Sequence, residues 1–222
     1  MQTIIIKNPK LATSLSVDCE DETVEMIAKV IELACASNYF VLKLAQFSQT
    51  QNARVSFTAN DKGIPLQGLW IPKQSMIWIN HMLPLDKLVQ TLVFELCNAT
   101  NDELTSEKIH FCNFNNGKGY ANFIEKAEHQ SFLESCRIYL ELISKYPTLL
   151  TPSQKDLQDF QQLADETSYL EFVKQNGHYQ FYINAYEQWA KKNHPLKSMA
   201  FFTKSETPIQ DLGHIITYYR NR

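Results

Sequence analysis

The residues best suited to chemistry stand near the end of an apolar segment that spans residues 85–98. Leucine and valine recur there three and four residues apart, a spacing that predicts an amphipathic helix. Thr91, Glu95 and Asn98 share one face of this helix, because positions three and four apart are neighbours. A carboxylate is costly to bury in an apolar helix unless it is paired or coordinated. Glu95 is therefore either a boundary residue that reaches solvent or a group held in a polar site for catalysis or binding.

The elements that must position Glu95 follow from periodicity and turn residues. Helices and strands both precede residue 98 and only helices follow it, which predicts an α+β fold with a small mixed sheet. The polar segment 100–119 is expected to be a loop, and residues 60–63 a turn. The predicted helices cover residues 24–35, 39–48, 85–98, 120–145, 151–163, 169–175, 179–192 and 209–219. The predicted strands cover residues 53–58, 66–71 and 76–80, the last two joined as a hairpin by residues 72–75.

Length and composition limit the function classes. A chain of 222 residues suits one domain, residues 1–147, followed by a helical C-terminal extension, residues 148–222, packed on it. The net charge of −3 gives no electrostatic argument for nucleic acid. The five cysteines form no CxxC pair and are expected to be reduced thiols. With no signal peptide and no membrane span, the chain is expected to be cytoplasmic as synthesised, which leaves signal-peptide-independent secretion open.

A Gly-x-x-x-Pro turn leads into the strand that ends Ile77-Trp78-Ile79-Asn80, and the apolar helix follows this strand. This order of elements resembles that of the zincin metallopeptidases. Their active-site helix carries His-Glu-x-x-His, and the sequence Phe94-Glu95-Leu96-Cys97-Asn98 falls at the corresponding place. The resemblance implies that Glu95 matches the general-base glutamate, whereas Phe94 and Asn98 replace the two zinc-binding histidines. It covers residues 24–144 and extends to uncharacterised bacterial domains that are metallopeptidase-like.

In the gluzincins a glutamate on a downstream helix completes the zinc site, and the resemblance implies Glu125 or Glu128 for that role. Without imidazole on the motif helix, no zinc and no other cofactor is expected there, because phenylalanine cannot ligate and an amide oxygen suits zinc poorly. A hard cation such as Mg²⁺ or Ca²⁺ is the open alternative, with oxygen ligands from Glu95, Asn98 and Glu128. A purely structural use, in which Glu95 accepts hydrogen bonds from Asn98 and the facing helix, is the main expectation.

Two functions follow from this resemblance. The first is a zincin-derived pseudoenzyme, of bacterial and effector- or toxin-like origin, that binds a protein or peptide partner without cutting it. The second is an active hydrolase in which Glu95 is the general base, Asn98 and Glu128 assist it, and the metal is atypical or absent. A helical scaffold whose resemblance to zincins is accidental is the third hypothesis.

The remaining chemistry-bearing residues favour structural roles. Cys97, His110 and Cys112 lack the spacing of a zinc finger. Cys97 and Cys136 could in principle act as nucleophiles, but their helical, apolar surroundings favour packing. His129 is interpreted as a structural histidine. The histidines of the C-terminal third share no spacing and receive no chemical role: His178, His194 and His214.

Overall fold

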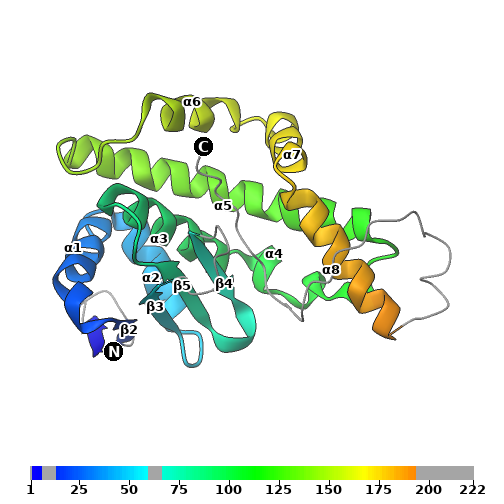
Figure 1. Ribbon diagram of the computed structural model, residues 1–222, viewed down its shortest axis with the longest axis horizontal. Helices are drawn as coiled ribbons and strands as arrows, with labels where there is room; N and C mark the ends of the chain where they lie inside the picture. Colours follow the sequence, from blue (N-terminus) through cyan, green and yellow to red (C-terminus); the bar gives the residue numbers. More distant parts are fainter. Residues whose placement is uncertain (1, 7–13, 60–66, 194–222) are drawn as a thin grey trace.

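A five-stranded mixed sheet forms the first layer of the fold (Figure 1). The computed structural model describes residues 2–6, 14–59 and 67–193. The strand order is β1-β2-β3-β5-β4; β2, β3 and β5 run parallel, and β1 and β4 pair antiparallel at the two edges. The bounds of the strands are Gln2–Ile6 (β1), Leu15–Cys19 (β2), Arg54–Thr58 (β3), Gly68–Ile71 (β4) and Met76–Asn80 (β5).

Alternating side chains place the apolar face of the sheet against helices. Val17, Val55 and Ile77 lie in register across the three parallel strands and are all buried, because every second side chain points to the same face. Their cluster also contains apolar residues of α1 (Val24–Ala34), α2 (Asn38–Ser48) and α3 (Leu85–Ala99). The main core of the domain therefore lies between this face of the sheet and these helices.

Helix α3 is the element around which the other layers pack. It follows β5 directly along the chain and contacts β4, β5, α1, α2 and α5. The β4–β5 hairpin turns through a 3-10 segment, Pro72–Gln74, and through Ser75, which has a φ of +48°. The sequence-based expectation of an α+β fold with a small mixed sheet is confirmed.

The second half of the described chain is helical. Helix α5 (Gly117–Lys145) crosses the whole molecule, and α6 (Gln154–Gln162) and α7 (Glu166–Gln175) lie on its side away from the sheet (Figure 1). Helix α8 (His178–Asn193) packs against the N-terminal half of α5. Across the described ranges, no helix has both the length and the apolar character needed to cross a bilayer.

Two sequence-based expectations about the fold were wrong. The loop expected over residues 100–119 contains α4 (Asp102–Thr105), two 3-10 turns and the start of α5. Helix α5 begins at Gly117 because the Asn116 side chain accepts a hydrogen bond from the backbone N–H of Gly119. Strand β2 was missed. The predicted turn at residues 60–63 and the predicted helix at residues 209–219 lie outside the described residues.

Strand β4 lies so close to α3 that only glycine fits at position 68. A Cβ atom on Gly68 would lie 2.5 Å from Thr91 Cγ2 and 3.0 Å from Glu95 Cγ. We therefore expect Gly68→Ala to lower the free energy of unfolding by about 1–3 kcal/mol, measured by urea denaturation. The matched control is Gly119→Ala, whose Cβ would meet only Asn116 Oδ1, at 3.6 Å. This control should be neutral or stabilising by up to about 1 kcal/mol. Equal stability of Gly68→Ala and the wild type would contradict the close packing of β4 on α3.

Candidate functional site

Glu95 and Asn98 project from α3 into the interior. Glu95 is 1% exposed and Asn98 is fully buried, so the expected burial of Glu95 is confirmed and the solvent-reaching alternative is wrong. Asn98 Nδ2 donates a hydrogen bond to Glu95 Oε2 at 3.3 Å. Phe94, which precedes Glu95, is 2% exposed and belongs to the main apolar core. The motif helix thus presents a carboxylate and an amide to the site, and no imidazole.

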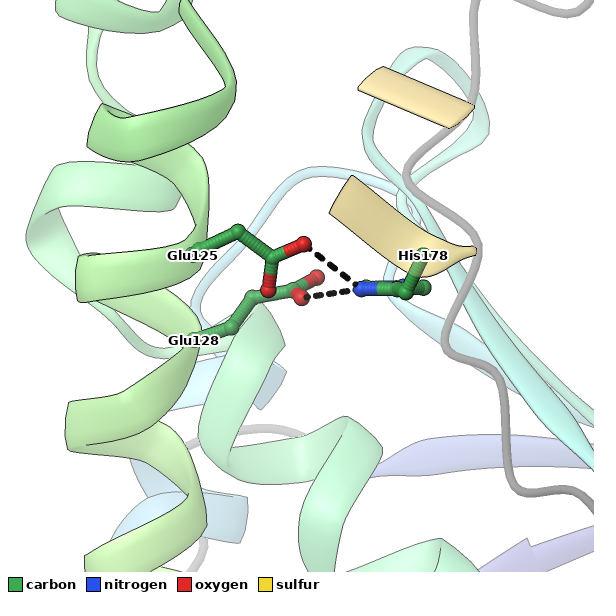
Figure 2. A group of neighbouring side chains, drawn as sticks. All are labelled: Glu125, Glu128 and His178. Carbon is green, nitrogen blue, oxygen red and sulfur yellow. Dashed lines mark hydrogen bonds and ion pairs between the residues drawn. The ribbon is translucent and has the colours of Figure 1, made fainter. Parts of the chain in front are cut away.

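A second pair of carboxylates comes from α5. Glu125 and Glu128 are three residues apart and therefore share one face of the helix, and both are fully buried. The Tyr182 hydroxyl of α8 donates a hydrogen bond to Glu128 Oε1 at 2.7 Å. The Nδ1 atom of His178, the first residue of α8, lies 2.9 Å from Glu125 Oε1 and 3.7 Å from Glu128 Oε2 (Figure 2). Three helices therefore supply the polar cluster that comprises Glu95, Asn98, Glu125, Glu128 and His178.

The sharp turn between α7 and α8 brings His178 to this cluster. Helix α7 ends at Gln175, and Gly177 adopts a φ of +80°, the left-handed region that glycine enters without a steric penalty. Helix α8 then packs along α5, with Ile183 against Gly117 and Tyr182 in the aromatic cluster beside Tyr120. The imidazole of His178 is 5% exposed as a result.

The electrostatics of the cluster keep Glu128 protonated at neutral pH. Burial raises the pKa of Glu128 to about 8, and the nearby carboxylates of Glu125 and Glu95 act in the same direction. His178 and the hydrogen bond from Tyr182 oppose this rise in pKa. The influence of Glu95 on this pKa shows that its carboxylate lies in the electrostatic neighbourhood of the α5 pair. Burial also raises the pKa of Tyr182 well above its usual value, so this hydroxyl remains a hydrogen-bond donor.

Within the described ranges, one group of side chains has the spacing of metal ligands. It consists of Glu125, Glu128 and His178, whose potential ligand atoms all lie within 4.8 Å of one another. Of the residues that the sequence suggested as weak metal candidates, the structure brings Glu125 and Glu128 together in this group, and Glu95 is not part of it. The α3 motif itself does not fit zinc, because Phe94 has no ligand atom and Asn98 offers only an amide oxygen, which suits zinc poorly.

His178 is the site residue that sequence reasoning missed. Its proximity to Glu125 arises from a contact between residues 53 positions apart, and no local motif marks it. Gly177, directly before His178, is the one sequence feature that could have indicated its position. A lone glycine between two helical patterns indicates a sharp reversal of the chain. His194 and His214 lie outside the described residues.

The other candidates have structural roles. Burial raises the pKa of the Cys97 thiol strongly and that of Cys136 to about 12, which leaves both as neutral thiols and poor nucleophiles. All five cysteines are free, and Cys112 is exposed whereas Cys97 is buried. His129 Nε2 lies 3.0 Å from the Leu163 carbonyl oxygen, which agrees with the structural role predicted for this histidine.

A separate surface feature is a hollow of about 190 Å³ between α2 and α5. Leu42 and Tyr39 contribute exposed apolar surface to it, with exposed fractions of 64% and 45%. Its polar border includes Lys43, which pairs with Glu134, and Arg137, whose guanidinium lies over the Tyr39 ring.

Comparisons with family models, with curated proteins and with solved structures found no match to this chain. Its function therefore has to be argued from the polar cluster and its surroundings.

The raised pKa of Glu128 predicts a pH dependence of stability. Folding raises this pKa from 4.5 to about 8, so the folded state keeps a proton that the unfolded state loses. The free energy of unfolding therefore falls as pH rises through that range. With a chelator present, we expect the free energy of unfolding to fall by about 2 kcal/mol more in wild type than in Glu128→Gln between about pH 6 and about pH 9. Urea denaturation at both pH values measures this difference. Parallel pH profiles of the two proteins would contradict the assignment.

Proposed function

We propose that the chain is a zincin-derived protein that does not cleave peptides and acts as a protein-binding module. The order of elements supports this proposal: an antiparallel edge strand, β4, hairpins into β5, and the motif helix α3 follows with its glutamate at position 95. The buried glutamates of α5 face the same interior as Glu95, which is where the resemblance to gluzincins would require a downstream carboxylate.

The proposal depends mainly on the residues at the two positions where zincins have their zinc-binding histidines, which here are Phe94 and Asn98. Phe94 is part of the apolar core, and Asn98, whose Nδ2 donates to Glu95, offers an amide oxygen where a zincin has an imidazole. A catalytic zinc ion needs three protein ligands and an open position for water. Neither position supplies such a ligand, so the chemistry that activates water in a zinc peptidase is lost at this helix.

Helix α8 adds a second argument against peptide cleavage. The four residues of β4 are buried, and Phe181 of α8 packs against the cluster formed by Leu69 and Ile71 on this strand. An extended peptide could pair with a sheet edge only if that edge were open. Helix α8 therefore contacts both the strand, through Phe181, and the polar cluster, through His178 and Tyr182.

The hollow between α2 and α5 supports the binding half of the proposal. It combines an exposed apolar centre, Leu42 and Tyr39, with a charged border, which is the usual composition of a surface that binds another protein. The hollow is lined by residues of α2 and of the second half of α5 and shares no residue with the polar cluster, so partner binding would not require access to Glu95.

One observation favours the alternative function, a hydrolase with Glu95 as general base. A buried carboxyl group with a raised pKa is a candidate acid or base, and burial raises the pKa of Glu128 to about 8, with the Glu95 carboxylate acting in the same direction. This function would require α8 to move away, because both carboxyl groups are buried.

A peptide-cleavage assay separates the two functions. The full chain is incubated with a diverse peptide mixture, with and without added Zn²⁺ or Mn²⁺, and the products are identified by mass spectrometry. We expect no cleavage above that of Glu95→Gln, since the motif helix holds no zinc ligand. Cleavage by the wild type that disappears in Glu95→Gln would establish the hydrolase and overturn the proposal.

The melting temperature of Glu95→Gln provides an independent test. The amide keeps an acceptor for the Asn98 hydrogen bond and removes a negative charge from beside Glu128, so we expect an unchanged or higher melting temperature. Thermal denaturation followed by circular dichroism measures it. A loss of several degrees would show instead that the Glu95 carboxylate is a paired structural anion, and both functional hypotheses for this residue would then fail.

A further inference from the structure

Two buried carboxylate oxygens point to a missing ligand. Glu125 Oε2 and Glu128 Oε2 are shielded from solvent and accept no hydrogen bond from the described part of the chain. A buried polar atom without a hydrogen bond loses the full free energy of its hydration, and a carboxylate loses the most. Both glutamates lie on the buried face of α5 and are fully buried. Rotation of their side chains therefore does not bring these oxygens into contact with bulk water.

The potential ligand atoms of Glu125, Glu128 and His178 lie within 4.8 Å of one another, close to the spacing that ligands of one ion require. Ligands arranged tetrahedrally around an ion at 2.0–2.2 Å lie about 3.3–3.6 Å apart. His178 Nδ1 lies 2.9 Å from Glu125 Oε1 and 3.7 Å from Glu128 Oε2, which brackets that spacing (Figure 2). Small rotations of the two glutamate side chains would bring all three donors to a common ion.

The charge of the cluster also suits a divalent cation. Two carboxylates and a neutral imidazole around one dication sum to zero charge, which is the state that a fully buried site favours. Without the ion, one carboxyl group has to keep a proton, because like charges at short range oppose joint ionisation. Glu95, on the facing helix, adds further negative potential at the site.

We propose that Glu125, Glu128 and His178 form a binding site for one first-row transition-metal dication, of the Zn²⁺ and Mn²⁺ type. The mixture of two carboxylates with one imidazole, without a thiolate, matches the ligand preferences of these ions. Calcium prefers six to eight oxygen ligands, which this group does not provide. The site belongs to α5 and α8 and uses no residue of the α3 motif, so it can be present whether or not the chain is derived from a zincin.

The site has a role in the architecture. The ion would join α8 to α5 beside Tyr182, whose hydroxyl donates to Glu128 and orients it as an outer-shell partner. It would thereby fix the helix that covers β4. Binding the ion therefore stabilises the closed arrangement of the C-terminal extension.

The test is a titration of the full chain after removal of metals with a chelator. We expect Zn²⁺ and Mn²⁺ to bind at one ion per chain, with Zn²⁺ tighter, and Ca²⁺ to show no saturable binding. Glu128→Gln and His178→Gln should each weaken binding by about 100-fold or more, since each loses a ligand. Glu134→Gln is the matched control, because it removes an exposed carboxylate from the same helix. Its affinity should equal that of the wild type.

Spectra of the Co²⁺-substituted chain distinguish this site from adventitious binding at the exposed Cys112. Ligation by oxygen and nitrogen gives ligand-field bands without a thiolate charge-transfer band, and Cys112→Ser should leave the spectrum unchanged. If the ligand variants fail to fold, the wild type still decides the question, because an ion that binds the folded state should raise its melting temperature by several degrees. No saturable binding, affinity unchanged in the ligand variants, binding of Ca²⁺ equal to Mn²⁺, or a thiolate band would each overturn the proposal.

Discussion

The burial of carboxyl groups between three helices is the constraint on which the rest of the structure depends. Glu95 comes from α3, and Glu125 and Glu128 come from α5, in an interior where an uncompensated charge is prohibitively unfavourable. Each group around them supplies part of the compensation: the amide of Asn98, the hydroxyl of Tyr182 and the imidazole of His178. Close packing of β4 on α3 serves the same cluster, since the absence of a Cβ atom on Gly68 lets the strand lie against Thr91 and Glu95.

Helix α8 completes this compensation and so links the C-terminal extension to the α+β core. Its first two turns carry His178 and Tyr182, and Gly177 makes the reversal that brings these turns to α5. Phe181, between them, packs on the cluster at β4. The polar cluster and the covering of the edge strand are therefore consequences of one docking event.

The sequence predicted the elements whose periodicity is strong, and it failed where tertiary contacts decide. The apolar spacing of residues 85–98 predicted α3 and the inward position of Glu95, and the same reasoning located Glu125 and Glu128 on the long helix. Strand β2 was missed because Leu15–Cys19 alternates over five residues and draws its stability from pairing with β1 and β3. His178 could not be identified because its partner Glu125 is 53 positions away and only the docking of α8 brings the two together.

The proposed loss of peptidase chemistry and the proposed ion site concern different helices of one cluster. The motif helix keeps the glutamate without histidine, whereas α5 and α8 combine two glutamates with a histidine. The central claim is that this second set of residues is a coordination site. Crystals of the full chain grown without chelator, with anomalous diffraction collected at the metal absorption edge, test it most directly. The account predicts a peak about 2.0–2.2 Å from Glu125, Glu128 and His178. A well-ordered crystal with these three side chains in their places, soaked in Zn²⁺ and showing no anomalous peak between them, would contradict it.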